Sequence, residues 1–289
     1  HAIVDPSIEM RSVWCADGVD ATGALGTCQN PDEPDPVDPP NPPDEGACFS
    51  GLYQNTHDQL RRFDPLTNDF QNIGAPTGDT WNAMGYAREL GAFYALSTNG
   101  GIHPQSTLVE IALDGTYTAH AKPEGLPRDG YYIADVDPAT GTDLWVSGGM
   151  IRNGKMWKID LTTNTAVEVR FNRAFGSGRA SGADMAWLDG DLYVVGQNGD
   201  MFVFDPDTLT YSQKFVTDLK TGFFGAVWIT AGEVMYAFHN KTGNVYEIRD
   251  FLDDSPRAVH VGSMTPSNRN DGAGCVEGPS PFTDPDAYI

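Results

Sequence analysis

A repeat of short segments centred on an alanine most limits what this 289-residue chain can fold into. The five alanines lie 51, 49, 43 and 47 residues apart: Ala83, Ala134, Ala183, Ala226 and Ala273. Each of the first four segments precedes two further short stretches in which apolar and polar residues alternate, a pattern typical of β-strands. Four short strands repeated every 40 to 50 residues or so are typical of β-propeller blades. The sequence therefore predicts an all-β fold.

Each full repeat supplies four predicted strands. The alanine segment suits the innermost strand, because backbones converge there and large side chains would clash. The second strands are predicted at residues 93–96, 144–146, 192–195 and 234–238. The third strands are predicted at residues 108–111, 156–160, 201–205 and 245–248. More polar fourth strands follow, for example at residues 166–171 and 211–216.

The first repeat lacks its innermost strand, because residues 51–54, 59–64 and 69–73 supply only the other three. Residues 271–276 provide the missing strand at the far end of the chain. We therefore predict a five-bladed β-propeller over residues 47–276, closed by its C-terminal strand. Closure would also remove exposed sheet edges. A β-sandwich with irregular repeats is the alternative.

Four cysteines support closure of the ring: Cys15, Cys28, Cys48 and Cys275. An even number without CxxC spacing indicates disulfides in an oxidising compartment rather than a zinc site. A bond between Cys48 and Cys275 would lock the ring and contribute about 5 kcal/mol. Cys15 and Cys28 would then pair within an N-terminal arm.

The chain outside the predicted propeller has a different composition. We expect residues 1–30 to form an arm and residues 31–46, which are rich in proline and acids, to form an extended spacer. Residues 277–289 form a C-terminal tail. Two short apolar stretches of the arm, residues 2–4 and 12–14, could add a strand to another sheet, so self-association through the arm is one expectation.

Charge excludes several partners. The chain carries 18 Lys and Arg against 40 Asp and Glu, a net charge of −22 with a pI near 4.3. Nucleic-acid binding depends on basic residues, and anionic lipid would repel this surface. No apolar run reaches the roughly 20 residues that cross a bilayer. We therefore expect neither nucleic-acid binding nor membrane insertion, and a secreted or cell-surface location.

Three strand segments carry a resemblance to a known family. The segments Trp81–Tyr86, Ala134–Asp137 and Asn270–Cys275 resemble the NALGYN-, GDVD- and NDG-C-type strands of uncharacterised secreted β-propeller domains. Met84 replaces leucine and Ala134 replaces glycine in that pattern. The resemblance implies an extracellular propeller and no known reaction.

Carboxylates on the predicted innermost strands are the first candidate site. Asp135, Asp137, Asp184 and Asp271 would lie around the axis, where some five-bladed propellers hydrolyse glycosides. We favour a structural role, in which Asp135, Asp184 and Asp271 accept backbone N–H groups or hold an axial water or calcium ion. Residues 135–143 also resemble a calcium loop, but Pro138 and the lack of a distal glutamate favour a turn.

Histidines are the second candidate site. His57, His103 and His239 all fall between second and third strands, on one face of three adjacent blades, and converging imidazoles could bind copper. Methanotroph surface copper-binding proteins are weakly similar, with His57 and His103 as the paired imidazoles. His1 could chelate copper through its amine and ring, as in lytic polysaccharide monooxygenases. Residues 1–6 faintly resemble the N-terminal residues of those enzymes.

The expected function is a secreted, non-enzymatic module that binds or assembles on an extracellular surface or matrix. The predicted disulfides, the projecting arm and the lack of a coherent catalytic set of residues favour it. A histidine-ligated copper protein and a five-bladed-propeller glycosidase are the alternatives. No cofactor is firmly expected.

Overall fold

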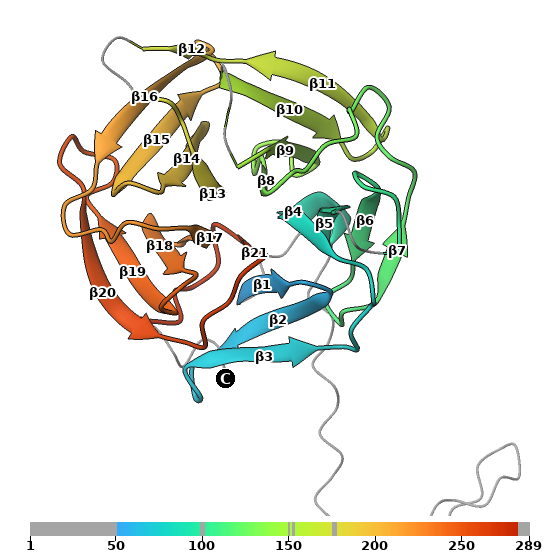
Figure 1. The fold of residues 1–289 in the computed structure, drawn as a ribbon, viewed down its shortest axis with the longest axis horizontal. Coiled ribbons are helices and arrows are strands. Elements are labelled where there is room, and N and C mark those ends of the chain that lie inside the picture. Colours follow the sequence, from blue (N-terminus) through green and yellow to red (C-terminus); the bar gives the residue numbers. More distant parts are fainter. Residues whose placement is uncertain (1–50, 99–101, 150, 152–153, 175–177, 283–289) are drawn as a thin grey trace, which may run out of the picture. The chain divides into compact units, whose positions relative to one another are not determined.

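The computed structural model describes residues 51–98, 102–149, 151, 154–174 and 178–282. The predicted arm and spacer, and with them His1, Cys15, Cys28 and Cys48, lie outside the described residues. The described part is all-β apart from one short 3-10 helix, η1 (Arg88–Leu90). Its strands form five sheets arranged as blades around a common axis (Figure 1). The predicted five-bladed propeller is confirmed.

The first blade joins both ends of the described chain. Its strand order is β21 (Asn270–Gly274), β1 (Leu52–Thr56), β2 (Gln59–Asp64) and β3 (Asp69–Ile73). β21 pairs antiparallel with β1, from Leu52 opposite Gly274 to Thr56 opposite Asn270. The C-terminal strand therefore completes the sheet that the early residues begin, as predicted.

The remaining blades follow one another along the chain. The second contains β4 (Trp81–Ala87), β5 (Ala92–Ser97), β6 (Leu108–Ile111) and β7 (Tyr117–Ala119). The third contains β8 (Ile133–Val136), β9 (Asp143–Ser147), β10 (Lys155–Asp160) and β11 (Thr165–Arg170). The fourth contains β13 (Gly182–Leu188), β14 (Asp191–Gly196), β15 (Asp200–Asp205) and β16 (Thr210–Phe215), with β12 (Asn172–Arg173) parallel to β16. The fifth contains β17 (Phe224–Thr230), β18 (Val234–His239), β19 (Asn244–Arg249) and β20 (Arg257–Ser263).

Five inner strands surround the axis, one from each blade: β21, β4, β8, β13 and β17. Small residues are required where they approach each other. A Cβ added at Gly85 would lie 2.8 Å from the backbone nitrogen of Val136. The aromatic residues of the second strands, such as Trp145 and Tyr236, are 5% and 0% exposed and pack between blades. Both features were predicted from the repeat.

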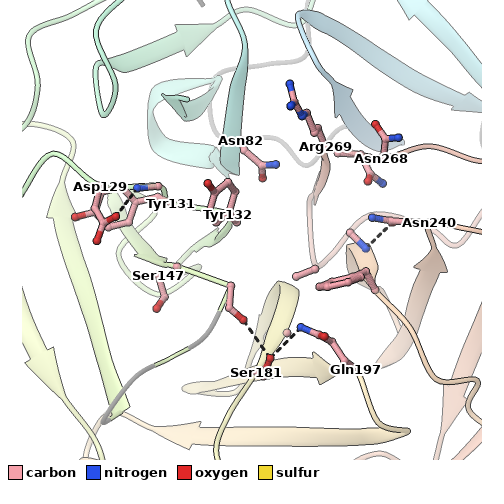
Figure 2. A pocket seen from close by; sticks show the side chains of 18 of the residues that line it. Asn82, Asp129, Tyr131, Tyr132, Ser147, Ser181, Gln197, Asn240, Asn268 and Arg269 are labelled. Carbon is pink, nitrogen blue, oxygen red and sulfur yellow. Dashed lines mark hydrogen bonds between the residues drawn. The ribbon is translucent and has the colours of Figure 1, made fainter. Parts of the chain in front are cut away.

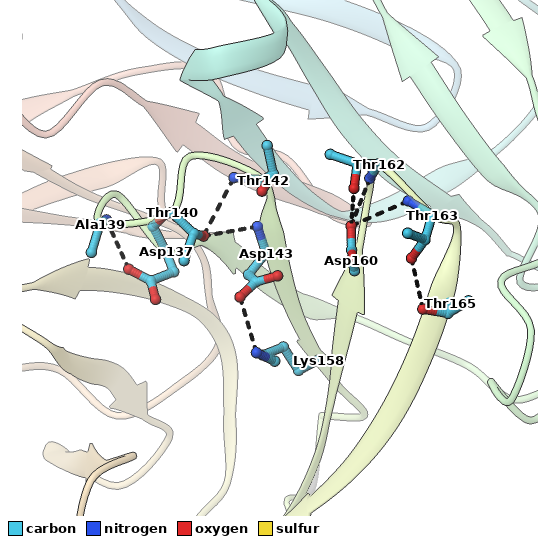
Figure 3. Close-up of polar contacts among 10 residues, drawn as sticks. All are labelled: Asp137, Ala139, Thr140, Thr142, Asp143, Lys158, Asp160, Thr162, Thr163 and Thr165. Carbon is cyan, nitrogen blue, oxygen red and sulfur yellow. Dashed lines mark hydrogen bonds and ion pairs between the residues drawn. The ribbon is translucent and has the colours of Figure 1, made fainter.

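Acidic and threonine residues stabilise the turns at the propeller's periphery (Figure 3). Asp160 Oδ1 accepts hydrogen bonds from Thr162 N at 2.8 Å and Thr163 N at 3.2 Å. The calcium-like segment forms a similar turn, in which Asp137 Oδ1 accepts from Ala139 N at 2.9 Å. The carboxylate of Asp143 pairs with Lys158 at 3.0 Å. The turn interpretation of residues 135–143 is confirmed.

Two further sequence expectations concern covalent closure and membranes. Cys275 is disulfide-bonded, but its partner lies outside the described residues, so the pairing with Cys48 stays a prediction. Among the described residues, no helix has the length and apolar character needed to span a membrane.

Candidate functional site: a central cavity

A cavity of about 1290 Å³ opens where the inner strands begin (Figure 2). Every blade contributes to its wall, from residues far apart in the sequence. One lining residue from each blade, taken in ring order, is Arg269, Asn82, Tyr132, Ser181 and Asn240. Convergence of all five blades on one hollow is the arrangement in which a ligand is held from many sides at once.

Several uncharged polar side chains line the cavity wall. Side-chain amides come from Asn82, Gln197, Asn240, Asn268 and Asn270, and each amide offers both donors and acceptors. Some of these amides already form hydrogen bonds within the protein. Asn240 Oδ1 accepts a hydrogen bond from Gly225 N at 2.8 Å, and Gln197 donates to Ser181 Oγ at 2.9 Å.

Asn270 differs from the other amides. Its residue is only 2% exposed, yet neither Nδ2 nor Oδ1 has a hydrogen-bond partner. A Cβ at Gly225 would lie 2.5 Å from Asn270 Oδ1, so glycine is needed there to accommodate the amide. Buried polar groups are nearly always paired, and an exception therefore needs an explanation. Both atoms are buried, so a group in the cavity does not reach them in this structure.

Aromatic side chains add apolar surface to the same cavity. Tyr132 is 45% exposed and Phe223 is 55% exposed, and Trp157 lines the wall with its ring under the Lys155 ammonium group. Large exposed aromatic rings are costly unless something covers them, and ring faces pack well on flat apolar surfaces. The cavity therefore combines amides with aromatic contact surface.

The charges in the cavity contrast with those of the whole chain. Lys155, Lys241 and Arg269 line it, whereas Asp129 is the one carboxylate among the described lining residues. Lys155 is compensated by Glu168 at 2.8 Å. Lys241 and Arg269 are exposed and form no ion pair with any described residue. A net positive cavity thus exists in a chain of charge −22.

The axial carboxylates lie outside this cavity and accept backbone N–H groups. Asp184 Oδ1 accepts from Met185 N at 2.8 Å, and its Oδ2 accepts from Val227 N at 2.6 Å and Gly272 N at 3.0 Å. Asp135 accepts from Trp187 N at 2.9 Å and Val136 N at 2.8 Å. Asp271 accepts from Met84 N. The structural role predicted from the sequence is confirmed for these contacts.

Irregular pairing of the inner strands creates the need for these carboxylates. The register shifts in β4 between Asn82 and Gly85, in β13 between Gly182 and Met185, and in β17 between Phe224 and Ala226. A β-bulge withdraws backbone groups from the ladder, and a buried N–H without an acceptor is costly. The aspartates supply acceptors across neighbouring blades.

Burial keeps protons on these acids. It raises the pKa of Asp135 to about 7, against the hydrogen bonds from Trp187 and Val136 that favour the ionised form. Burial likewise raises the pKa of Asp184 and Asp271 well above the ordinary value, and the charge of the neighbouring Asp184 raises the pKa of Asp271 further. Asp135 also lines a second cavity of about 30 Å³, the size of a water site.

The three described candidate histidines occupy different surroundings. His57 lies in the β1–β2 turn, and its carbonyl accepts from Trp81 N at 3.2 Å. His103 lies before β6, where its backbone N–H donates to Asp79 Oδ1 at 3.3 Å. His239 is buried, with Nε2 3.2 Å from Thr221 O and Nδ1 2.8 Å from Thr242 Oγ1. Both ring nitrogens of His239 are therefore engaged within the protein.

The described part of the chain contains no assembled metal site. No group of three or more His, Cys, Asp or Glu side chains there is arranged to hold an ion. The histidine copper site and the axial calcium ion stay predictions, and His1 lies outside the described residues.

Sequence reasoning missed the cavity itself. It treated the aromatic residues as packing and assigned no role to Asn82, Asn270 or Arg269. The Ser267–Asn270 run, polar throughout and directly before the closing strand, was the one local signal. Nothing local indicated that it would face Tyr132 across the axis.

Comparison with known proteins finds distant likenesses among solved structures. No curated protein matches the chain. Among solved structures, a glutaminyl cyclase from Myxococcus xanthus is 14% identical, with 67% of this chain and 74% of that chain covered and a TM-score of 0.45. A chain of a nidogen/laminin complex is 11% identical, with 79% and 100% covered and a TM-score of 0.47. A virginiamycin B lyase from Staphylococcus aureus is 12% identical, with 83% and 75% covered and a TM-score of 0.43.

The family comparison covers nearly the whole propeller. The model of a family described as "Repeat of unknown function (DUF6923)" matches residues 50–277, which run from just before β1 to just after β21. This span includes every described strand and all the residues that line the central cavity. The chain therefore belongs to the DUF6923 repeat family.

Proposed function

We propose that this protein is a secreted, non-enzymatic binding module that holds the sugar residues of an extracellular glycan in its central cavity. The observation that carries the proposal is the convergence of side-chain amides from four blades on one hollow that also exposes Tyr132 and Phe223. Hydroxyl groups of a sugar both donate and accept, as an amide requires of its partner. A binding site of this kind rejects ligands that leave its polar groups unpaired.

The aromatic residues support the same ligand class. Sugar rings present hydroxyl groups at their edges and C–H groups on their faces. Tyr132 and Phe223 offer ring surfaces for those faces, while the amides around them suit the hydroxyl groups. Burying that apolar area on binding contributes favourable free energy that does not depend on charged groups.

The carboxylates favour binding over hydrolysis. Glycoside hydrolysis ordinarily uses two carboxyl groups on either side of the scissile bond. Asp129 is the one carboxylate among the described residues of the cavity wall. Asp135 and Asp184 accept backbone N–H groups with both oxygens, which is a structural use of each side chain.

A glycan panel tests the proposal. We expect calorimetry to detect binding of at least one oligosaccharide class, with the glycan recovered intact by mass spectrometry. Phe223→Ala should weaken that binding about tenfold, because it removes an aromatic contact in the cavity. Phe215→Ala is the matched control, since Phe215 is 72% exposed on β16 and does not line the cavity. Absence of binding across the panel, an equal effect of both variants, or cleaved glycan would each contradict the proposal.

A further inference from the structure

Two cations of the central cavity have no counter-charge among the residues that the structure describes. Arg269 precedes β21 in the first blade, and Lys241 lies in the β18–β19 turn of the fifth. The two loops contact each other, because Ser267 N donates to Asn240 O at 3.2 Å. Both cations line the cavity beside the unpaired Asn270. A local positive edge is therefore held at one side of the cavity.

The rest of the cavity does not neutralise this edge. Asp129 lies across the cavity from Arg269, with Tyr131 and Tyr132 (Figure 2). The carboxylate of Asp129 already accepts a hydrogen bond from Gly130 N at 2.8 Å. Lys155 is held by Glu168. Arg269 and Lys241 thus remain as the two cations available to a ligand among the described lining residues.

The backbone of Arg269 is held in an uncommon conformation. Its φ is 51°, a left-handed value that costs a residue other than glycine roughly 1 kcal/mol. The Arg269 carbonyl accepts a hydrogen bond from His57 N at 3.2 Å, and the next residue begins the β21–β1 ladder. The surrounding structure therefore fixes the backbone of Arg269, and with it the base of the side chain that carries the guanidinium.

We propose that the glycan is acidic, and that Arg269 and Lys241 bind the carboxylate of a uronic acid residue. The inference rests on the proposed glycan binding. A guanidinium binds a carboxylate through two parallel hydrogen bonds, and such charge-assisted bonds are about twice as strong as neutral ones. Repulsion from the chain's net charge is screened beyond about 8 Å at physiological salt, so local contacts decide.

Methyl esterification gives a probe that changes only the charge. Calorimetry would compare tetramers of galacturonate, mannuronate and glucuronate with their methyl esters, which keep the ring and its hydroxyl groups. We expect at least one acid to bind about tenfold or more tightly than its ester. Arg269→Gln and Lys241→Gln should each remove most of that difference. Arg173→Gln and Lys220→Gln are matched controls, exposed and outside the cavity wall, and should leave the difference as it is in the wild type.

The outcomes separate this inference from the proposed function. If esters or other neutral glycans bind as tightly as the acids, the carboxylate inference is wrong and glycan binding stands. If no glycan binds, both fail. If a synthetic peptide of residues 31–45 binds the propeller more tightly than any uronate, through Arg269 and Lys241, the cavity recognises an acidic peptide and the saccharide inference is overturned.

Discussion

Polar side chains at the start of the five inner strands and those further along differ in whether they have hydrogen-bond partners within the protein. Where the strands begin, Asn270 keeps two buried amide atoms unpaired, and Arg269 and Lys241 have no described counter-charge. Further along the strands, Asp184 uses both carboxylate oxygens to accept three backbone N–H groups. Asp184 is therefore satisfied by the protein itself, whereas the amide of Asn270 is not.

This contrast distinguishes structure from function within one repeat. Polar groups that a fold needs are satisfied inside it, whereas unsatisfied ones mark places where a ligand or solvent completes the set. The axial aspartates were catalytic candidates because carboxylates on the innermost strands lie around the axis. Their hydrogen bonds assign them to strand tethering, and the neutral amides at the strand starts become the better site.

Loss of the saturated contacts should have the largest effect. Asp184→Ala leaves Met185 N, Val227 N and Gly272 N without their acceptor, and each buried orphan costs about 1–3 kcal/mol. We expect a loss of about 4 kcal/mol, or a Tm lower by about 10 °C, in thermal and urea unfolding. Asp184→Asn keeps one acceptor oxygen and should lose about half as much. A Tm within 2 °C of wild type for the alanine variant would remove the basis for the tethering role.

The protonated carboxyl of Asp135 should appear in the pH dependence of stability. Its pKa is about 7 in the folded protein against an ordinary value of 3.8, so the folded state holds its proton longer than the unfolded state does. Its contribution is fully present below about pH 4 and is lost as the pH rises through 7. Asp184 and Asp271 act in the same direction.

The variant Asp135→Asn isolates that contribution. We expect its Tm to fall less steeply than that of wild type between pH 4 and pH 7, because one titrating group has been removed. Unfolding by differential scanning calorimetry at five or six pH values would measure the two slopes. Parallel curves would mean that Asp135 is ionised in the folded protein over this range.

The smallest expected effects come from replacing two buried asparagines on the cavity wall and comparing the stabilities of the two variants. Asn82 is 5% exposed and its Oδ1 accepts from Ala83 N at 2.8 Å, whereas Asn270 is 2% exposed and unpaired. Asn82→Ala should cost about 1–2 kcal/mol. Asn270→Ala should cost less than about 0.5 kcal/mol, since no side-chain hydrogen bond is lost. The reverse order of stabilities in urea unfolding would show that Asn270 is a structural residue.

Strand positions were predictable because they depend on local patterns. Apolar alternation located β5, β9, β14 and β18, and the alanine spacing located the inner strands to within a few residues. The missing first strand and its counterpart after residue 270 predicted the closure seen between β21 and β1. The acceptor role of Asp135 and Asp184 followed from their place on inner strands, whereas the bulges that require it were not visible in the sequence.

The cavity wall was not predictable in the same way. Asn82, Asn240 and Arg269 come from three blades, lie in loops or at strand starts, and do not occupy equivalent repeat positions. Composition indicated an acidic chain. The net charge, which sums over all 289 residues, does not reveal that two cations without a described counter-charge line one hollow. The histidines, prominent in the sequence, turned out to occupy separate surroundings.

The sequence by itself determined the number of blades, the order of their strands and the return of the chain's end to its beginning. These properties depend on periodicity and on contacts between neighbouring repeats, which a linear pattern records. Only the tertiary structure decided which polar groups are satisfied and which remain available. The saturation of Asp184 and the isolation of Asn270 depend on distances between strands tens to hundreds of residues apart, and no local pattern encodes such distances.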